Sequence, residues 1–592
     1  MEHSFRYDLH PDIVMTDSQW HTLRAHLLRN PERRWLFWPA AKEQLAFLLA
    51  SGNMSEYRRR LLVRELLLAG PEDLLRQSHS SIAPKPEFVM DALNRCREEG
   101  LHLIEVHSHP FSRGAGTTFS SIDWNNDLGK MPALAALLDD FMHVTMVVGR
   151  DSLDGHFYDR LSGEILPIRQ VTLVSDSSEF KNGHAGLHYI PTTNAINMER
   201  ETSPETATSG TEEQYARQEL IFGRSTQQRL GRSTVAVVGL GGLGSFVALE
   251  LAHLGVGSLI LIDPDRVEVT NLNRLLGAEP AHVGLAKVDV YKQLIERIAP
   301  TVHVEALPLS ILDEAALTYA KGADILVGCV DSHGARMILN QLAVRYLIPL
   351  VDGGSGIKRL TDSSPLKAGG QVQVVLPNLG CLECRGFIDA RRAAFDLASP
   401  ERQAEERAHG YGLHTPAPAV IFLNGVIGSL QVGEVVSLLT GLGVQTPRPV
   451  PPIGLYDAFE RSLLAVDPQA SPECLTCGEE GVTGIGDLAP IRRATDAESG
   501  TPIPLVRSSE PSEDISEAVL SISSVNGQGE EKHARTAETV QPGPGAAVVA
   551  GDDGTVSLPG RNGSFWSFLG GLPQRFRLAL RRGHSQEGNN ED

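Results

Sequence analysis

Hydrophobic and polar positions recur along the chain in two ways, which predict helices and strands. The period of an amphipathic helix is found at residues 21–28 and 90–99. Short apolar runs, which are typical of buried strands, lie at 101–106, 143–148, 234–238, 258–262, 302–306, 325–327 and 347–351. Helical segments separate the strands over 213–488, and this alternation predicts a parallel sheet covered on both faces. We therefore expect an α/β protein with a doubly wound second domain.

Two stretches lack this periodicity. Residues 175–212 are rich in Ser, Thr, Glu and Gly, which predicts a linker, placed at 166–212 between domains at 1–165 and 213–488. Residues 489–592 are expected to form a mostly disordered tail, because Ser, Glu, Gly and Pro dominate it. Its end combines aromatic residues with arginines, which also suits a docking or membrane-surface peptide. Pro573 and two glycines interrupt any long helix there, so a weakly packed tail is favoured.

Charge and cysteine content narrow the function classes. With 53 Lys and Arg against 73 Asp and Glu, the net charge of −20 argues against nucleic-acid binding, which needs clustered basic residues. Six cysteines in 592 residues are too few for a disulfide-rich secreted protein. The first residues show no signal peptide, and no uninterrupted apolar run reaches the roughly 20 residues that span a bilayer. These features favour a cytoplasmic protein.

A candidate metal centre lies in the first domain, in the stretch IEVHSHPFSRGAGTTFSSID. If residues 101–109 form a strand, its period of two places His107 and His109 on one face. Together with the carboxylate of Asp123 they offer three ligands and leave a fourth position open, as in catalytic rather than structural zinc sites. Ser120 is placed to hydrogen-bond a developing oxyanion.

This H-x-H-P followed by S-x-x-D resembles the JAMM/MPN metallo-isopeptidase family, whose fold is a cytidine-deaminase-like α/β domain. The resemblance implies zinc-dependent hydrolysis of peptide or isopeptide bonds, and an upstream glutamate that acts as general base. Glu43 opens the segment KEQLAFLLASG, which is similar to the family's glutamate followed by an apolar run, and we choose it as that base. Glu65, in a predicted strand, and Glu105, on the same strand face as the two histidines, are the alternatives.

A second candidate site is the glycine-rich turn in TVAVVGLGGLGS, between a predicted strand and a predicted helix. Such a turn brings a phosphate to a helix N-terminus, and Asp263, at the end of the next strand, can bind ribose hydroxyls. The glycines are Gly239, Gly241, Gly242 and Gly244. Farther along the chain come Asp265, Asn271, Arg274, Lys287 and Asp331. Two cations and additional acids suit a reacting triphosphate with Mg²⁺ better than the dinucleotide of a dehydrogenase.

This array, with EEQYARQELIFG upstream, resembles the ThiF/MoeB/HesA adenylyltransferases, which have a Rossmann-like fold and are related to ubiquitin-activating enzymes. The resemblance implies that the glycine turn and Asp263 hold ATP, and that Asp331 positions Mg²⁺ and the α-phosphate. It also implies a homodimer in which Arg217 reaches the phosphates of the neighbouring subunit. Phosphate contacts are assigned to Asn271, Arg274 and Lys287. The implied reaction adenylates the C-terminal glycine of a ubiquitin-like protein.

Four of the cysteines form two C-x-x-C pairs, Cys381 and Cys384 with Cys474 and Cys477. Two such pairs are typical of a closed tetrahedral zinc site, and a redox role for either pair is the less favoured alternative. Cys96 and Cys329 remain, and both are expected to be buried packing residues. Thioester-forming members of the resembled family keep a cysteine in the segment after the first pair, where this chain has none. We therefore expect adenylation without the usual thioester.

Both sites on one chain predict a bifunctional enzyme of a bacterial ubiquitin-like conjugation pathway, with a conjugating enzyme as a further partner. It would process a ubiquitin-like protein and then activate its C-terminal glycine, the flexible linker letting one tail visit both sites. The alternative is activation of a sulfur-carrier protein for cofactor or amino-acid biosynthesis, with a sulfurtransferase as partner. The expected cofactors are ATP, Mg²⁺ and two zinc ions, one catalytic and one structural.

Overall fold

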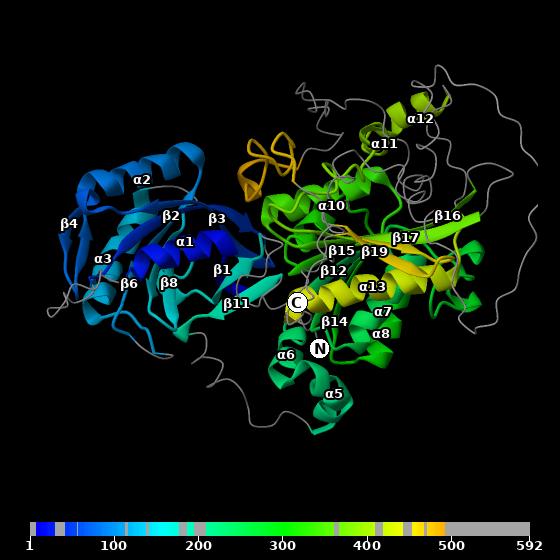
Figure 1. Cartoon of the computed structure of the whole chain (residues 1–592), viewed down its shortest axis with the longest axis horizontal. Coiled ribbons are helices and arrows are strands. Elements are labelled where there is room, and N and C mark those ends of the chain that lie inside the picture. Colours follow the sequence, from blue (N-terminus) through cyan, green and yellow to red (C-terminus); the bar gives the residue numbers. More distant parts are fainter. Residues whose placement is uncertain are drawn as a thin grey trace, which may run out of the picture.

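Two large mixed sheets with helices packed against them lie side by side in the described part of the chain (Figure 1). The computed structural model describes residues 8–29, 42–55, 57–112, 116–137, 141–176, 186–194, 209–359, 366–408, 418–441, 453–466 and 470–491. The predicted tail lies outside the described residues from 492 onward, and with it the aromatic and arginine-rich end.

The N-terminal sheet has nine strands. In spatial order they are β11 (Leu187–Pro191), β10 (Gln170–Val174), β1 (Asp8–Thr16), β3 (Arg58–Leu68), β2 (Leu45–Met54), β6 (His102–Ser108), β7 (His143–Val148), β8 (Leu153–Asp159) and β9 (Glu164–Pro167). Among the described residues, the helices α1 (Asp17–Leu27), α2 (Pro86–Glu99) and α3 (Ser121–Leu137) accompany it. A small sheet of β4 (Leu74–Gln77) and β5 (Ile82–Pro84) lies beside them.

The central strand β2 is buried on both faces, and its alternate residues serve two different cores. Ala46, Leu48 and Ala50 pack in one core with Trp20 and other residues of α1. Leu45, Phe47 and Leu49 face the opposite core, together with Ala92 and Cys96 of α2. The helices therefore cover both faces of the sheet, and the period of two along β2 decides which helix each side chain meets.

The second sheet has eight strands, five parallel and three added antiparallel at one side. In spatial order they are β14 (His303–Leu307), β13 (Ser258–Ile262), β12 (Thr234–Val238), β15 (Ile325–Gly328), β16 (Leu350–Arg359), β17 (Leu366–Val375), β18 (Ile453–Asp457) and β19 (Ser462–Val466). Its helices are α5 (Ser209–Phe222), α6 (Arg224–Leu230), α7 (Gly242–His253), α8 (Lys287–Ile298), α9 (Glu314–Ala320), α10 (His333–Tyr346), α11 (Ala390–Asp396), α12 (Pro400–Ala408) and α13 (Ile421–Thr440).

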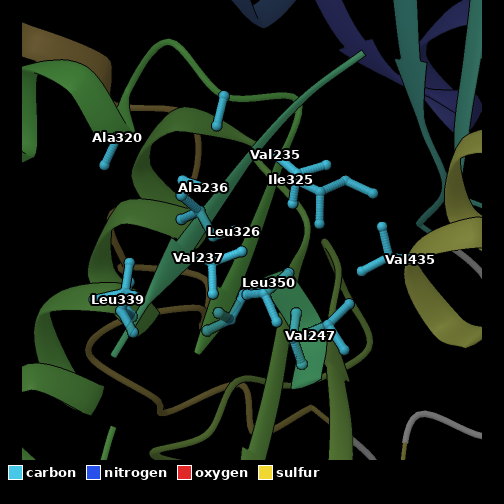
Figure 2. Close-up of a cluster of buried hydrophobic side chains, with 14 of the residues drawn as sticks. Val235, Ala236, Val237, Val247, Ala320, Ile325, Leu326, Leu339, Leu350 and Val435 are labelled. Atoms are coloured by element: carbon cyan, nitrogen blue, oxygen red, sulfur yellow. The ribbon is translucent and has the colours of Figure 1, made fainter. Parts of the chain in front are cut away.

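Apolar side chains of the parallel strands fill the core of this second sheet. Figure 2 shows Val237 of β12 and Leu326 of β15 among side chains such as Val247 of α7, Leu339 of α10 and Val435 of α13. Among the described residues, α13 is the one helix long and apolar enough to cross a membrane by length and composition. It packs against α7, β16 and β17 here, which makes it a core helix of this domain.

Six of the seven sequence-based strands agree with the structure to within two residues at each end, but the strand expected at 347–351 is β16, which begins only at Leu350 and runs to Arg359. The predicted linker at 166–212 is wrong over much of its length. β10 pairs in parallel with β1, and β11 pairs antiparallel with β10, so the first domain extends to about residue 191. Helix α5 begins at Ser209, before the expected start of the second domain. These strands were missed because they are short and lie at one side of the sheet, where polar residues interrupt the apolar pattern.

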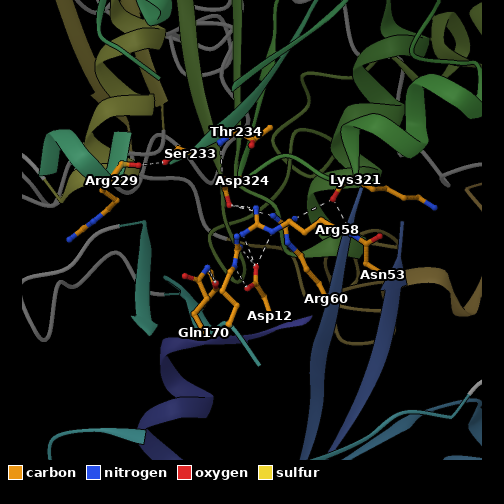
Figure 3. A network of polar contacts seen from close by, with 12 residues as sticks. Asp12, Asn53, Arg58, Arg60, Gln170, Arg229, Ser233, Thr234, Lys321 and Asp324 are labelled. Carbon is orange, nitrogen blue, oxygen red and sulfur yellow. Dashed lines mark hydrogen bonds and ion pairs between the residues drawn. The ribbon is translucent and has the colours of Figure 1, made fainter. Parts of the chain in front are cut away.

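A buried ion network joins the two domains (Figure 3). The Arg58 guanidinium of β3 lies 2.6 Å from Asp12 of β1 and 2.6 Å from Asp324, which precedes β15. Arg169 also binds Asp12, at 2.6 Å, and the Thr234 backbone N–H donates to Asp324 at 2.9 Å. Burial raises the pKa of Asp12, but Arg169 and Arg58 outweigh that effect and hold it well below the usual range. The acids are therefore charged and paired inside the interface.

Apolar packing and a C-terminal segment reinforce this interface. Leu62 of β3 and Leu187 of β11 belong to the same buried cluster as the core of the second sheet. The segment after β19 returns to the first domain, where the Ser51 hydroxyl donates to the Gly484 carbonyl at 2.5 Å and the Met54 N–H donates to Asp487 at 2.9 Å. The two domains are thus docked through charged, apolar and backbone contacts, which argues against the freely moving arrangement that the sequence suggested.

Substitution of Arg58 tests this interface. Arg58→Met is expected to lower the free energy of unfolding by about 3 kcal/mol, because it leaves two buried carboxylates without their shared cation. Chemical denaturation measures the change. Arg64→Met, at an exposed position of the same strand, is the control and should stay within about 0.5 kcal/mol of the unsubstituted protein. Equal effects of the two substitutions would contradict the network's role.

Candidate functional site

The metal-centre residues predicted in the first domain converge. His107 lies on β6, and the His109 backbone N–H donates to the Val148 carbonyl of β7, so the chain stays extended between the two histidines. Asp123 lies in the first turn of α3, with Oδ2 at 3.6 Å from His107 Nε2 and 3.5 Å from His109 Nε2. His107 Nε2 is buried and has no hydrogen-bond partner among the described residues. Two imidazoles and a carboxylate this close fit a zinc ion.

Ser120 caps the helix that carries the third ligand. Its hydroxyl donates to Asp123 Oδ2 at 2.6 Å, and the Asp123 N–H donates back to Ser120 Oγ at 3.2 Å. This reciprocal arrangement at the start of α3 fixes the Asp123 side chain beside the histidines. The oxyanion role expected for Ser120 stays a prediction.

The structure separates the three candidate bases. Glu43 lies just before β2, next to the end of β6, and only 7% of it is exposed. Burial raises the pKa of its carboxyl, and it interacts electrostatically with His107, His109 and Asp123. Glu43 therefore lies against the metal centre, as a general base requires.

The other two carboxylates already have cationic partners. Glu105 Oε2 is 2.8 Å from Lys130 Nζ of α3. Glu65 forms an ion pair with Arg95 of α2, in which both side chains are partly exposed. A base held by a full positive charge is a poor proton acceptor, so this geometry favours Glu43 over both alternatives.

The glycine turn of the second domain joins β12 to α7 in a conformation that requires glycine. Gly239 has φ of 90°, and a Cβ on Gly244 would lie 1.8 Å from the Gly239 carbonyl oxygen. A Cβ on Gly241 would meet nothing within 4 Å, so this residue borders open space. No side chain caps α7 there, which leaves the N–H groups of its first turn available to a phosphate.

Acidic residues and a lysine surround this turn. Asp263, at the end of β13, accepts the Leu240 N–H at 2.5 Å and the Asp265 N–H at 2.8 Å. Lys287, at the start of α8, lies 2.7 Å from Asp265 and 3.5 Å from Asp263. Burial raises the pKa of Asp263, and Lys287 opposes that shift. The turn thus lies next to a buried carboxylate and a buried ammonium.

The remaining predicted residues differ in how closely the structure ties them to this pocket. Asp331 is exposed after β15, which is the parallel neighbour of β12, so it lies at the same edge as the glycine turn. The Arg274 guanidinium donates to the Thr270 carbonyl at 2.7 Å. Thr270 and Asn271 are neighbours in a short 3₁₀ turn at Val269–Asn271. Arg217 is exposed on α5, and within the described ranges no hydrogen bond or ion pair joins it to the pocket.

Helix α13 contributes a residue that the sequence did not single out. Asn424 is buried, and its Nδ2 would lie 2.2 Å from a Cβ placed on Gly242. The Ser355 hydroxyl of β16 donates to Asn424 Oδ1 at 2.7 Å. No motif marks this asparagine in a mostly apolar helix. The available signal was a polar residue at a buried helical position, which Gln431 of the same helix also shows.

The four paired cysteines form one cluster. Cys381 Sγ lies 3.6 Å from Cys474 Sγ, and Cys384 Sγ lies 3.7 Å from Cys477 Sγ. Tetrahedral zinc with Zn–S bonds of about 2.3 Å would place its sulfurs about 3.8 Å apart. The donor set and its spacing therefore fit a closed zinc site, as expected from the two C-x-x-C pairs.

The two remaining cysteines lie in surroundings that disfavour the thiolate form. Cys96 is buried in α2, where burial raises the pKa of its thiol to about 12. Cys329 lies between β15 and Asp331, and burial raises the pKa of its thiol even further. A thiol attacks as its thiolate, so neither residue is suited to form a thioester at neutral pH.

Comparison with known proteins gives a match to the second domain. The model of the ThiF family matches residues 215–476. The sulfur carrier protein adenylyltransferase of Thermus thermophilus is 32% identical over 273 residues, covering 45% of this chain and 91% of the relative. The sulfur carrier protein ThiS adenylyltransferase of Escherichia coli is 28% identical over 268 residues, covering 45% and 94%. The crystal structure of Escherichia coli MccB with ATP gives a TM-score of 0.36 at 23% identity, covering 48% of this chain and 80% of that chain.

Metal removal tests the cysteine cluster. A chelator is expected to lower the thermal unfolding midpoint by about 5 °C or more, because four thiols packed this closely lose their shared cation. Differential scanning calorimetry with and without added Zn²⁺ measures the shift. The variant Cys474→Ser serves as the control, since it has already lost the site and the chelator should move its midpoint no further. An unchanged midpoint in the unsubstituted protein would rule out structural zinc here.

Proposed function

The chain belongs to the ThiF family, and we propose that its second domain uses ATP to adenylate the C-terminal carboxylate of a carrier protein that ends in glycine. The observation that carries this proposal is the uncapped N-terminus of α7 beside the Lys287 ammonium and the Asp263 carboxylate. The helix N-terminus and the lysine suit the phosphates of ATP, while the carboxylate suits its ribose. The names of the relatives, sulfur carrier protein adenylyltransferases, support the same reaction.

Charge stabilisation is the main task of these residues. The carrier's carboxylate attacks the α-phosphorus of ATP, the bond from that phosphorus to the bridging oxygen breaks, and pyrophosphate leaves. Lys287 and Arg274 offset the growing negative charge on the phosphates. Asp331 and Asp265 are exposed carboxylates at the same edge, and they offer the oxygen ligands that Mg²⁺ takes. Mg²⁺ would supply further charge compensation on the departing pyrophosphate.

A sulfur-carrier partner is better supported than a ubiquitin-like conjugation pathway. The relatives are named for sulfur carriers, and the partly buried Cys329 thiol, whose pKa is raised, does not suit thioester transfer. We therefore favour activation of a sulfur carrier, with a separate sulfurtransferase as the next partner, over transfer to a conjugating enzyme. A homodimer through this domain is part of the proposal. Leu220 and Ile221 are 86% and 72% exposed on α5, next to Arg217, and would be covered by a second copy.

A second activity, zinc-dependent hydrolysis of a peptide or isopeptide bond, is proposed for the first domain. The observation that favours it is the convergence of His107, His109 and Asp123 against a buried Glu43. Zinc bound there would act as a Lewis acid on the scissile carbonyl and activate water. Glu43 would accept the proton from that water and return it to the leaving amine. The substrate we propose is the carrier protein itself, as a precursor or as a conjugate.

Pyrophosphate exchange tests the adenylation. The protein is expected to catalyse ATP–pyrophosphate exchange only with a carrier protein that ends in glycine, and Lys287→Met should slow the exchange by about 10²–10³-fold. Lys292→Met, on the same helix α8, is the matched control and should retain the rate. The adenylation proposal fails if no glycine-terminated carrier supports exchange, and the role of Lys287 fails if both lysine variants behave alike.

Hydrolysis is tested by removing the base without removing the ligands. Glu43→Gln should slow cleavage of a carrier protein extended beyond its C-terminal glycine by about 10²–10⁴-fold, because the amide cannot accept the proton. Zinc content, measured by atomic emission, should not change. Glu65→Gln is the control and should cleave normally. Normal cleavage by the Glu43→Gln variant would show that the base lies elsewhere.

A further inference from the structure

One face of helix α3 carries a row of charged residues into the first domain. Asp123, Asp127 and Lys130 lie at positions i, i+4 and i+7, which share one side of a helix. Asp127 is 2% exposed and Lys130 is half-buried, whereas Trp124 and Leu128 on neighbouring positions are exposed. The helix therefore packs on the sheet through ionic groups as well as apolar ones.

Each of these groups has a specific partner on the sheet below. Lys130 Nζ lies 2.8 Å from Glu105 of β6 and 3.0 Å from Asp127. His156 Nε2 of β8 lies 2.8 Å from Asp127, with both side chains almost fully buried. Glu105 Oε2 is also 3.7 Å from His143 Nε2 of β7. Three adjacent strands thus hold the helix through one connected network.

An aromatic contact joins this network to the metal centre. The Phe119 ring lies 4.1 Å from the His156 ring and 6.1 Å from the His107 ring, measured between ring centroids. The Trp124 ring also lies 5.1 Å from that of His156, in an edge-on arrangement. His156 therefore contacts two aromatic residues at the start of α3, where Asp123 also lies.

We propose that Glu105, Asp127, Lys130 and His156 form a positioning network that fixes α3, so that Asp123 completes the metal centre. This inference rests on the hydrolytic function proposed above. Asp123 comes from a different element than His107 and His109, so the ligand geometry depends on how α3 sits on the sheet. Ion pairs removed from water have few alternative geometries, and they hold the helix at one depth and one rotation.

A second metal site is the competing explanation for these four residues together with His143. The Lys130 ammonium argues against it, because it already lies within 3.0 Å of both carboxylates. A divalent cation in the same space would face a fixed positive charge, which costs more than the carboxylates return. The network therefore positions the helix instead of binding an ion.

Metal affinity of the full chain tests the proposal independently of activity. The double variant Glu105→Gln with Lys130→Met removes both charges and keeps similar volumes, so it avoids a lone buried charge. Its affinity for Co²⁺ at the His107 site should fall by about 10–100-fold, the range seen when outer residues stop orienting ligands. The visible absorption of Co²⁺ gives the affinity, and His107→Ala identifies the signal of this site against that of the cysteine cluster. The single variant Lys130→Arg keeps the positive charge, and it should therefore bind Co²⁺ with most of the affinity of the unsubstituted chain.

Two controls make the outcomes distinct. The pair Glu65→Gln with Arg95→Met removes an exposed ion pair between β3 and α2, and it should leave the affinity unchanged. If circular dichroism shows that the double variant of the network does not fold, the Co²⁺ affinity of the single variant Asp127→Asn is measured in its place, with the same expected decrease. Unchanged affinity in a folded network variant overturns the positioning role while the metal centre stands. Failure of the unsubstituted chain to bind Co²⁺ at the His107 site overturns both the hydrolytic function and the network's role.

Discussion

The Arg58 guanidinium, held between Asp12 and Asp324, is the interaction on which the arrangement of the two domains depends. Removing three charged groups from water is costly, and their mutual attraction compensates only while the geometry is kept. Separation of the domains would break the ion pair between Arg58 and Asp324, because Asp12 belongs to the same domain as Arg58. It would also expose Leu62 and Leu187, which are buried against the second core. The two candidate sites therefore belong to one docked unit, although no single sheet or helix carries both.

This docking changes how two activities on one chain would cooperate. A carrier protein held at the metal centre cannot be delivered to the nucleotide pocket by a swinging domain, so its tail must leave one site before it enters the other. Strand β2 connects the metal centre to the domain interface. Glu43 of the metal centre precedes this strand, and Met54 at its other end contacts Asp487. Asp487 follows the second C-x-x-C pair by only ten residues. Zinc bound by the four cysteines would therefore also support the segment that contacts the first domain.

Much of the fold could be predicted from the sequence because its strands are buried on both faces. The strands at 143–148, 234–238 and 258–262 are mostly apolar runs, and the structure reproduces their limits. The composition of β10 and β11 predicts a linker because both strands are short and contain polar residues. β10 is a strand through its pairing with β1, more than 150 residues earlier in the chain, and β11 pairs with β10. The convergence of the cysteines and of the metal ligands followed from spacing and donor type, which are local properties of the sequence.

The role of an individual charged residue proved less predictable than its position. The period of two along β6 predicts Glu105 on the same strand face as His107, and both side chains do contact residues of α3. Whether such a carboxylate acts as a base or as an anchor depends on the cation beside it, and that cation is Lys130, which comes from a different element. The same holds in the second domain, where Lys287 is bound to Asp265 before any nucleotide arrives. Binding ATP would therefore require this lysine to exchange a carboxylate for a phosphate, so the lost ion pair offsets part of the new attraction.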